Sequence, residues 1–192
     1  MVQQTQKFSV ANIKPAPFID FLFSSPKMAW LWLIVRVWLG YQWITSGYGK
    51  LTNPGWMSGG EALKGFLNFS IQKAIEAPSH PPIAYSWYQA FLQSIVDSGA
   101  YTWMAKLVAF GEFLVGVALI LGLFTAVAAF FGGFMVWNFA LAGTAGVAPM
   151  FLLLSALLVA AWRIAGLWGL DRFRFEYLGT AWQPGKWFSK NK

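Results

Sequence analysis

The sequence contains no cysteine and a single histidine, His80. The lack of cysteine excludes disulfides, thiolate metal sites, persulfide carriers and CxxC redox chemistry within these residues. One histidine cannot build a bis-histidine haem site, and the sequence has no HExxH, clustered metal-ligand or flavin motif. Because a loop histidine in SHPP is usually solvated or interfacial, we expect neither haem nor pigment ligation by His80. Any sulfur or electron chemistry therefore requires another group.

Charge is also scarce, since charged residues make up 11% of the chain and hydrophobic residues 57%. An average soluble domain has about 25% charged residues. A bilayer core about 30 Å thick needs about 20 apolar residues per helix, and four such stretches are present, at 28–47, 104–123, 125–143 and 148–168. They are continuous, unlike the alternating segments of about ten residues found in membrane barrels. The sequence predicts an all-α, integral membrane four-helix bundle.

Basic residues flank the predicted spans and indicate their orientation. They are Lys7, Lys14 and Lys27 before the first span, and Arg172, Arg174, Lys186, Lys190 and Lys192 after the fourth. Because positive flanks remain on the inner side, both termini are expected to be cytoplasmic. The predicted organisation is a cytoplasmic segment (1–27), a membrane domain (28–172) and a basic cytoplasmic tail (173–192). Attraction to anionic lipid explains the net charge of +7 better than nucleic-acid binding does.

The segment 48–103, between the first two spans, is too long for a plain loop. Apolar residues recur on one helical face in two stretches on either side of SHPP. These are Leu63, Phe66, Leu67, Ile71 and Ile75, and then Ala84, Tyr88, Phe91, Leu92 and Ile95. We expect two amphipathic helices along the outer membrane interface. They form either a lid that only covers the bundle or a cap over a pocket for an amphipathic substrate.

Two charged residues fall inside the predicted spans. Arg36 and Glu112 each lie eight residues after the start of a span, and the spans run in opposite directions, so their backbones should differ by only about 6 Å in height. An unpaired charge at mid-bilayer costs at least about 2.5 to 3.5 kcal/mol. We therefore predict a salt bridge between them, either as a proton or anion site or as an interhelical clamp. Asp171 and Arg172 should cap a helix end or pair with the turn at Gly122.

Several stretches resemble the DoxX/DoxD family. They are RVWLGYQWITSGYGKLTNPGW (36–56), GEFLVGVALILGLFT (111–125) and AGLWGLDR (165–172), and the linking WYQAFLQSIV (87–96) is similar to the larger family members. The resemblance covers about residues 30–175, with the four spans in the expected order. The family pattern marks Arg36, Gly47, Lys50, Glu112, Gly116, Gly122, Gly169, Asp171 and Arg172.

DoxD-like proteins include the large membrane subunit of thiosulfate:quinone oxidoreductase, which oxidises thiosulfate to tetrathionate and passes the electrons to quinone. The resemblance thus implies an enzyme subunit in a bacterial or archaeal cytoplasmic membrane, a quinone as cofactor and a separate small partner subunit. It implies that Arg36 and Lys50 bind the sulfur oxyanion and that Arg36 and Glu112 are catalytic, with Glu112 relaying protons. The marked glycines, Asp171 and Arg172 would be structural features of the family.

A second hypothesis belongs to a different class. A cysteine-free, aromatic-rich four-helix protein also suits a non-catalytic accessory subunit of a larger respiratory or photosynthetic membrane complex. Its twelve tryptophans fit membrane interfaces and pigment packing, and a shared fold does not transfer function. An accessory subunit should copurify stoichiometrically with other membrane subunits, whereas an enzyme should reduce quinone alone or with one small partner.

Overall fold

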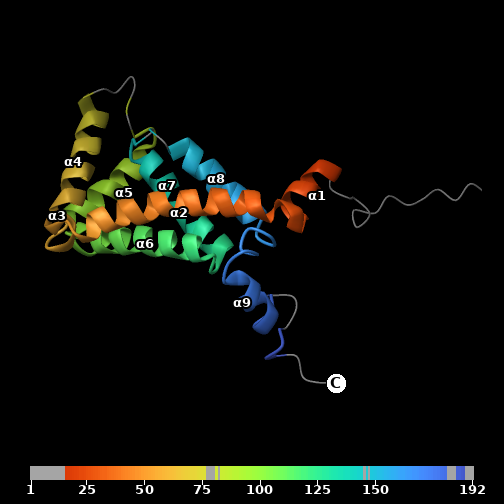
Figure 1. Cartoon of the computed structure of the whole chain (residues 1–192). Helices are drawn as coiled ribbons and strands as arrows, with labels where there is room; N and C mark the ends of the chain where they lie inside the picture. Colours follow the sequence, from red (N-terminus) through yellow and green to blue (C-terminus); the bar gives the residue numbers. More distant parts are fainter. Residues whose placement is uncertain are drawn as a thin grey trace, which may run out of the picture.

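The structure is a computed structural model that describes residues 16–76, 81, 83–144, 146, 148–180 and 185–188. Helices are the regular elements throughout these ranges (Figure 1). They are α1 (Pro17–Ser24), the 3-10 helix η2 (Pro26–Met28), α2 (Ala29–Leu51), α3 (Pro54–Met57), α4 (Glu61–Glu76), α5 (Ser86–Asp97), α6 (Tyr101–Leu121), α7 (Thr125–Leu141), α8 (Ala148–Ala160) and α9 (Asp171–Tyr177). The predicted all-α class is confirmed.

The antiparallel helices α2 and α6 lie side by side and form the centre of the molecule (Figure 1). Glycines allow their backbones to approach closely, as small residues do between membrane helices. A Cβ on Gly40 would lie 2.9 Å from Ile120 Cγ1, and one on Gly47 would overlap the backbone of Phe113. Gly116 has the same role on the α6 side. These contacts fix the register, with Gly40 beside Ile120 and Gly47 beside Phe113.

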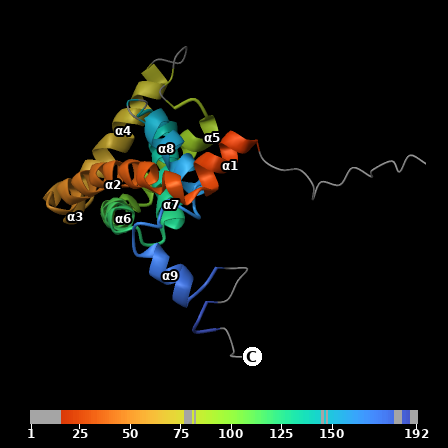
Figure 2. The same cartoon turned by 45° about the vertical axis from the view of Figure 1, so that its right-hand side comes forward.

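The main core lies where α2 and α6 meet α7, α8 and the residues after α8. Its largest members are Trp32, Leu39, Trp43, Leu119 and Leu158. A second, smaller cluster lies at the far end of the α2–α6 pair, where α4 and α5 pack on each other. Figures 1 and 2 show α4 at the end of this pair opposite α1.

Most residues of the predicted amphipathic faces in the 48–103 segment are buried by α4 and α5, but Ile75, Ala84 and Phe91 are exposed. Leu63, Leu67 and Ile71 of α4 pack in one cluster with Tyr88 and Leu92 of α5. The Tyr88 hydroxyl also donates to the carbonyl of Asn138 at 3.0 Å, which ties α5 to the end of α7. Burial raises the pKa of Tyr88 above its ordinary value. The apolar faces thus meet each other and the bundle, so α4 and α5 form a packed lid.

Length and composition make α6 the one helix of the described ranges that could cross a membrane unaided. The bent pair Pro17–Ser24 and Pro26–Leu51, which turns by 60°, meets the same criterion when counted together, whereas α7 and α8 are apolar but shorter. Only 33% of the apolar window of α6 is buried, unlike the core helix of a soluble protein. Large apolar side chains instead cover the outside of the bundle, among them Ile34, Leu107, Leu114, Phe130 and Leu153. Lipid tails suit such a surface.

The predicted fourth helix over 148–168 is too long, because α8 ends at Ala160. The next residues form successive turns, with hydrogen bonds from Ile164 N to Ala161 O (2.9 Å) and from Leu167 N to Ile164 O (3.1 Å). The end of this segment contacts the α6–α7 turn, where Leu170 N donates to Leu121 O at 3.1 Å. Apolar composition alone cannot distinguish a helix from turns that are packed against protein.

Candidate functional site

Glu112 of α6 is buried and has two side-chain partners on α2. Ser46 Oγ donates to Glu112 Oε2 at 2.8 Å, and Lys50 Nζ donates to the same oxygen at 2.6 Å. Lys50 Nζ also donates to Ser46 Oγ at 2.8 Å. Ser46 and Lys50 are four residues apart on one helix and therefore share a face. The three groups form a closed triangle, which we call the Lys50–Ser46–Glu112 cluster.

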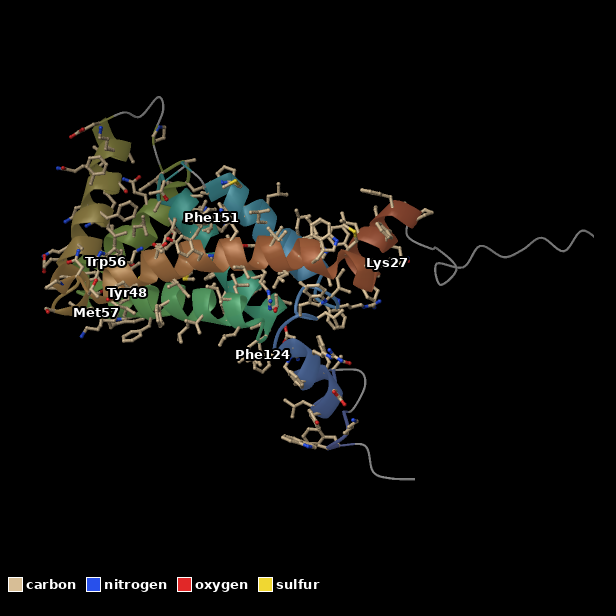
Figure 3. The ribbon with its side chains drawn as sticks, viewed as in Figure 1. Lys27, Tyr48, Trp56, Met57, Phe124 and Phe151 are labelled. Atoms are coloured by element: carbon tan, nitrogen blue, oxygen red, sulfur yellow. The ribbon has the colours of Figure 1, made fainter. Side chains whose placement is uncertain are left out.

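The two charges of this cluster differ in their access to the outside. The Lys50 side chain is 20% exposed and that of Glu112 only 2%. The ammonium lies over the Trp56 ring, 5.2 Å from its centroid, in a cation–π contact. Asn53 holds the short helix of Trp56 in place, since its Oδ1 accepts from Gly55 N at 2.8 Å. Figure 3 shows Trp56 beside the lid end of α2. A molecule at this end can reach the ammonium without unfolding the helix pair.

Arg36 is 1% exposed and lies at the opposite end of α2. Its Nη2 donates to Trp168 O at 3.3 Å, whereas Nε and Nη1 have no hydrogen-bond partner among the described residues. The guanidinium is wedged between two glycines, because a Cβ on Gly122 or on Gly169 would overlap Nη1. Gly122 also has φ 65°, a left-handed conformation that suits glycine at the end of a helix.

Asp171 lies at the same end of the α2–α6 pair as Arg36, and it connects the α6–α7 turn, the start of α7 and α9. Its Oδ1 accepts from Phe124 N at 2.9 Å and its Oδ2 from Thr125 N at 2.8 Å, so the carboxylate caps the start of α7. Arg174 Nε donates to Oδ1 at 2.8 Å, and Asp171 N donates to Gly122 O at 2.7 Å. The predicted pairing of Asp171 with the Gly122 turn is confirmed.

The predicted salt bridge between Arg36 and Glu112 is wrong, because the register of α2 and α6 places the two residues at different levels. With Gly47 beside Phe113, Glu112 lies near the end of α2 and Arg36 lies near the α6–α7 turn. At 1.5 Å per residue, they are about 18 Å apart along the helices. The prediction aligned the ends of the apolar runs, whereas the glycine contacts stagger the helices. Arg36 and Lys50 are about 21 Å apart for the same reason, so they cannot bind one small anion together.

Sequence reasoning found Lys50 but did not identify it as the partner of Glu112. The residue lies beyond the predicted end of the first span at residue 47 and was assigned to the outer segment, whereas α2 continues to Leu51. The signal was the spacing of Ser46 and Lys50, which places both on one face if the helix continues. No group of three or more residues that could hold a metal occurs in the part of the chain that the structure describes, and His80 lies outside it.

The DoxX family profile matches residues 31–145, from the start of α2 to just beyond α7. The match includes the whole Lys50–Ser46–Glu112 cluster and Arg36, but not Asp171. No curated protein and no solved structure matches the chain. The matched residues are more than half of the sequence, and they contain the apolar helix α6 with its exposed apolar surface. The chain is therefore a membrane protein that belongs to the DoxX family.

Proposed function

We propose that this protein is the membrane subunit of a quinone-linked oxidoreductase of the DoxD type, and that the Lys50–Ser46–Glu112 cluster is its reactive site. One observation carries the proposal: a buried carboxylate forms an ion pair with an ammonium that remains partly accessible. Ionisable residues inside membrane segments are functional by default, because their burial is costly. A partner that can be reached from outside allows the pair to open and exchange a ligand or a proton.

The proposal includes four spans, formed by α2, α6, α7, and α8 with the turns that follow it, and both termini on the cytoplasmic side. The distribution of charge supports this orientation. The lid end holds four lysines (Lys50, Lys64, Lys73, Lys106) and four acidic residues (Glu61, Glu76, Asp97, Glu112), which cancel. Among the described residues, the other end holds six basic side chains (Lys27, Arg36, Arg163, Arg172, Arg174, Lys186) and three acidic ones (Asp20, Asp171, Glu176), an excess of three positive charges. The positive-inside rule assigns such an end to the cytoplasm.

The cluster has the donors and acceptors that this chemistry requires. Lys50 would bind an oxygen of the thiosulfate anion, because charge-assisted hydrogen bonds to oxyanions are strong. Ser46 both accepts from Lys50 and donates to Glu112, so its hydroxyl can pass a proton between them. Glu112 would then deliver protons as a general acid. Arg36 lies too far away to take part, and we assign it a structural role.

A bound quinone would supply the redox chemistry, accepting the two electrons that two thiosulfate anions lose when they join through a new S–S bond as tetrathionate, together with two protons. The residues present fit such a group through the aromatic side chain beside the cluster, whereas the remaining N–H of Lys50 is taken by the thiosulfate oxygen. The nearby Trp56 offers an aromatic face. This chain would bind the anion, hold the acceptor and move the protons.

The test is purification in mild detergent, identification of copurifying proteins by mass spectrometry, and a thiosulfate-driven quinone reduction assay on the same fractions. We expect activity in a small assembly and a loss of at least about 100-fold in Glu112→Gln, the usual scale for a lost acid–base group. The matched control is Asp97→Asn, an acidic residue of the lid whose side chain bonds Gln93. Equal activity of both variants and the wild type would refute the assignment.

A second candidate function, a non-catalytic accessory subunit, is favoured by the outer surface of α7. Phe130, Phe134 and Trp137 are each more than half exposed, and they border an apolar groove of about 360 Å³ between α7 and α8. Aromatic side chains in such a position suit contact with a neighbouring membrane subunit. The same purification distinguishes an accessory subunit from an enzyme subunit, because an inactive protein held stoichiometrically in a large complex would favour the accessory role.

A further inference from the structure

Beyond the bundle, α9 and residues 185–188 fold together into what we call the C-terminal unit. Lys186 N donates to Glu176 O and Trp187 N to Tyr177 O, both at 3.1 Å, so the later residues run back beside α9. An ion pair between Lys186 Nζ and Glu176 Oε1 at 2.5 Å closes the unit. Figures 1 and 2 show that α9 projects away from the helices of the bundle.

Aromatic side chains of this region are directed outward. Trp187 is 72% exposed and Phe188 66%, and Phe173 of α9 and Trp168 just before it are also more than half exposed. The region has little core of its own to account for them. Tryptophan and other aromatic residues concentrate where a membrane meets water, because their rings tolerate both environments.

The basic residues here outnumber the acidic ones, and the acidic ones are already paired. Asp171 pairs with Arg174, and Glu176 pairs with Lys186. Arg172 is exposed and attracts Glu176 only at longer range, without a close ion pair among the described residues. Arg163, also exposed, lies over the Trp162 ring at 5.4 Å from its centroid. Two guanidinium groups therefore remain for an external anion, and their planar donors match phosphate oxygens well.

We propose that this surface binds the phosphate headgroups of anionic phospholipids, with Arg163 and Arg172 as the headgroup ligands and the exposed aromatic rings at the acyl boundary. The charge distribution supports this partner, because the described residues at the end of the protein that carries the C-terminal unit have an excess of three positive charges. Anionic lipids attract basic segments beside a membrane span. The site is independent of the chemistry at Glu112 and does not rest on the proposed function.

The test is native mass spectrometry of the full-length protein in detergent, titrated with phosphatidylglycerol or with phosphatidylcholine. We expect phosphatidylglycerol to bind at least about tenfold more tightly, and Arg163→Gln/Arg172→Gln to remove most of this preference, since each basic residue near an anionic surface contributes about fivefold. The matched control, Lys73→Gln/Lys106→Gln, removes two exposed lysines at the lid end and should keep the preference. Higher salt should weaken binding by the wild type.

Three results would overturn the proposal. One is equal affinity of the wild type for the two lipids, and another is the same loss of preference in both double variants. The third is displacement of phosphatidylglycerol by an equal concentration of inorganic phosphate, which shares the headgroup chemistry but lacks acyl chains. Both arginines are exposed, so their replacement should leave the fold intact, and size-exclusion chromatography checks this. Quenching of the wild type by brominated phosphatidylglycerol should exceed that of Trp187→Phe, which localises the lipid to the C-terminal unit.

Discussion

The α2–α6 pair itself contributes one buried charged side chain at each end, Glu112 at the lid end and Arg36 at the other, where Asp171 of α9 is also buried. The surroundings of Glu112 and Arg36 differ. Glu112 at the lid end is surrounded by the side chains of Ser46 and Lys50, and the lysine is partly exposed. Arg36 at the other end meets backbone, in the form of Trp168 O and the two glycines that enclose its guanidinium. Side-chain partners can rotate away and return, whereas backbone partners can leave only if the turn unfolds.

We infer from this difference that Glu112 can exchange a proton or a ligand, whereas Arg36 stabilises the fold at its end of the helix pair. Substitutions at the Arg36 end should therefore reduce stability, and substitutions at the Glu112 end should reduce activity with a smaller effect on stability. The predictions below test this division, each against a control elsewhere in the chain.

The largest effect is expected for Gly122→Ala. The new Cβ would overlap Arg36 Nη1, and the left-handed backbone adds its own strain. Together we expect a loss of about 2 to 5 kcal/mol, because a left-handed residue costs about 1 to 2 and overpacking about 1 to 3 kcal/mol. Gly99→Ala is the control, since its φ is 72° but nothing lies within 4 Å of the added Cβ. Thermal unfolding in detergent measures both, and equal losses would mean that Arg36 is not wedged.

Asp171→Asn should come next. The amide keeps the shape of the carboxylate but loses the charge that holds Arg174 and caps α7, and a buried group left partly unsatisfied costs about 2 to 4 kcal/mol. Glu176→Gln alters an acidic residue of the same helix whose lysine partner is exposed. It should leave the unfolding midpoint almost unchanged, because an exposed ion pair contributes little to stability. The unfolding midpoints of the two variants are measured. Equal midpoints would contradict the stabilising role assigned to the Asp171 carboxylate.

A double-mutant cycle on Lys50 and Glu112 should give a moderate coupling free energy. Glu112→Gln, Lys50→Met and the double variant are expected to show a coupling of about 1 to 2 kcal/mol, within the range for contacting residues. The more exposed pair Lys64–Glu61 should show a clearly weaker coupling in the same type of cycle. Chemical unfolding in detergent provides both values. If Lys50 and Glu112 couple as weakly as the exposed pair, the buried Glu112 carboxylate does not form the ion pair described here.

The smallest effect concerns Lys186 and Glu176 in the C-terminal unit. Their hydrogen bond lowers the pKa of Glu176 and raises that of Lys186. Because the pKa of folded Glu176 is depressed, its stabilising contribution is present above its ordinary pKa and is lost as pH falls through the folded value. Lys186→Gln should let the pKa of Glu176 rise toward the ordinary value, measurable by NMR of a labelled glutamate carboxyl. The unfolding midpoint at pH 7 should move by less than about 1 °C.

The sequence contains enough information to predict the helices but not their alignment. Continuous apolar runs gave the extents of α6 and α7 closely, and the spacing of Leu63, Leu67 and Ile71 gave the buried face of α4. These features depend on local pattern, which composition and periodicity report. The presence of four membrane spans and their orientation remain predictions.

The alignment of α2 and α6 depends instead on which residues allow the backbones to touch. Gly40, Gly47 and Gly116 set it, and a glycine in an apolar run gives no sign of which residue it faces. The pairing of Glu112 with Lys50 follows from this register and was missed with it. The contact of Asp171 with the Gly122 turn could be predicted, because both residues adjoin predicted span ends on the same side of the membrane.

The cap that Asp171 places on α7 also orders events during synthesis. The carboxylate binds the backbone of Thr125, 46 residues earlier in the chain, so α7 and α8 must emerge from the ribosome before the start of α7 can be capped. During that interval the α6–α7 turn depends on its own hydrogen bonds, and Arg36 lacks the segment that encloses it. Completion of the helix bundle is thus delayed until the chain reaches Asp171, and a chain that stops earlier leaves the start of α7 uncapped and Arg36 only partly enclosed.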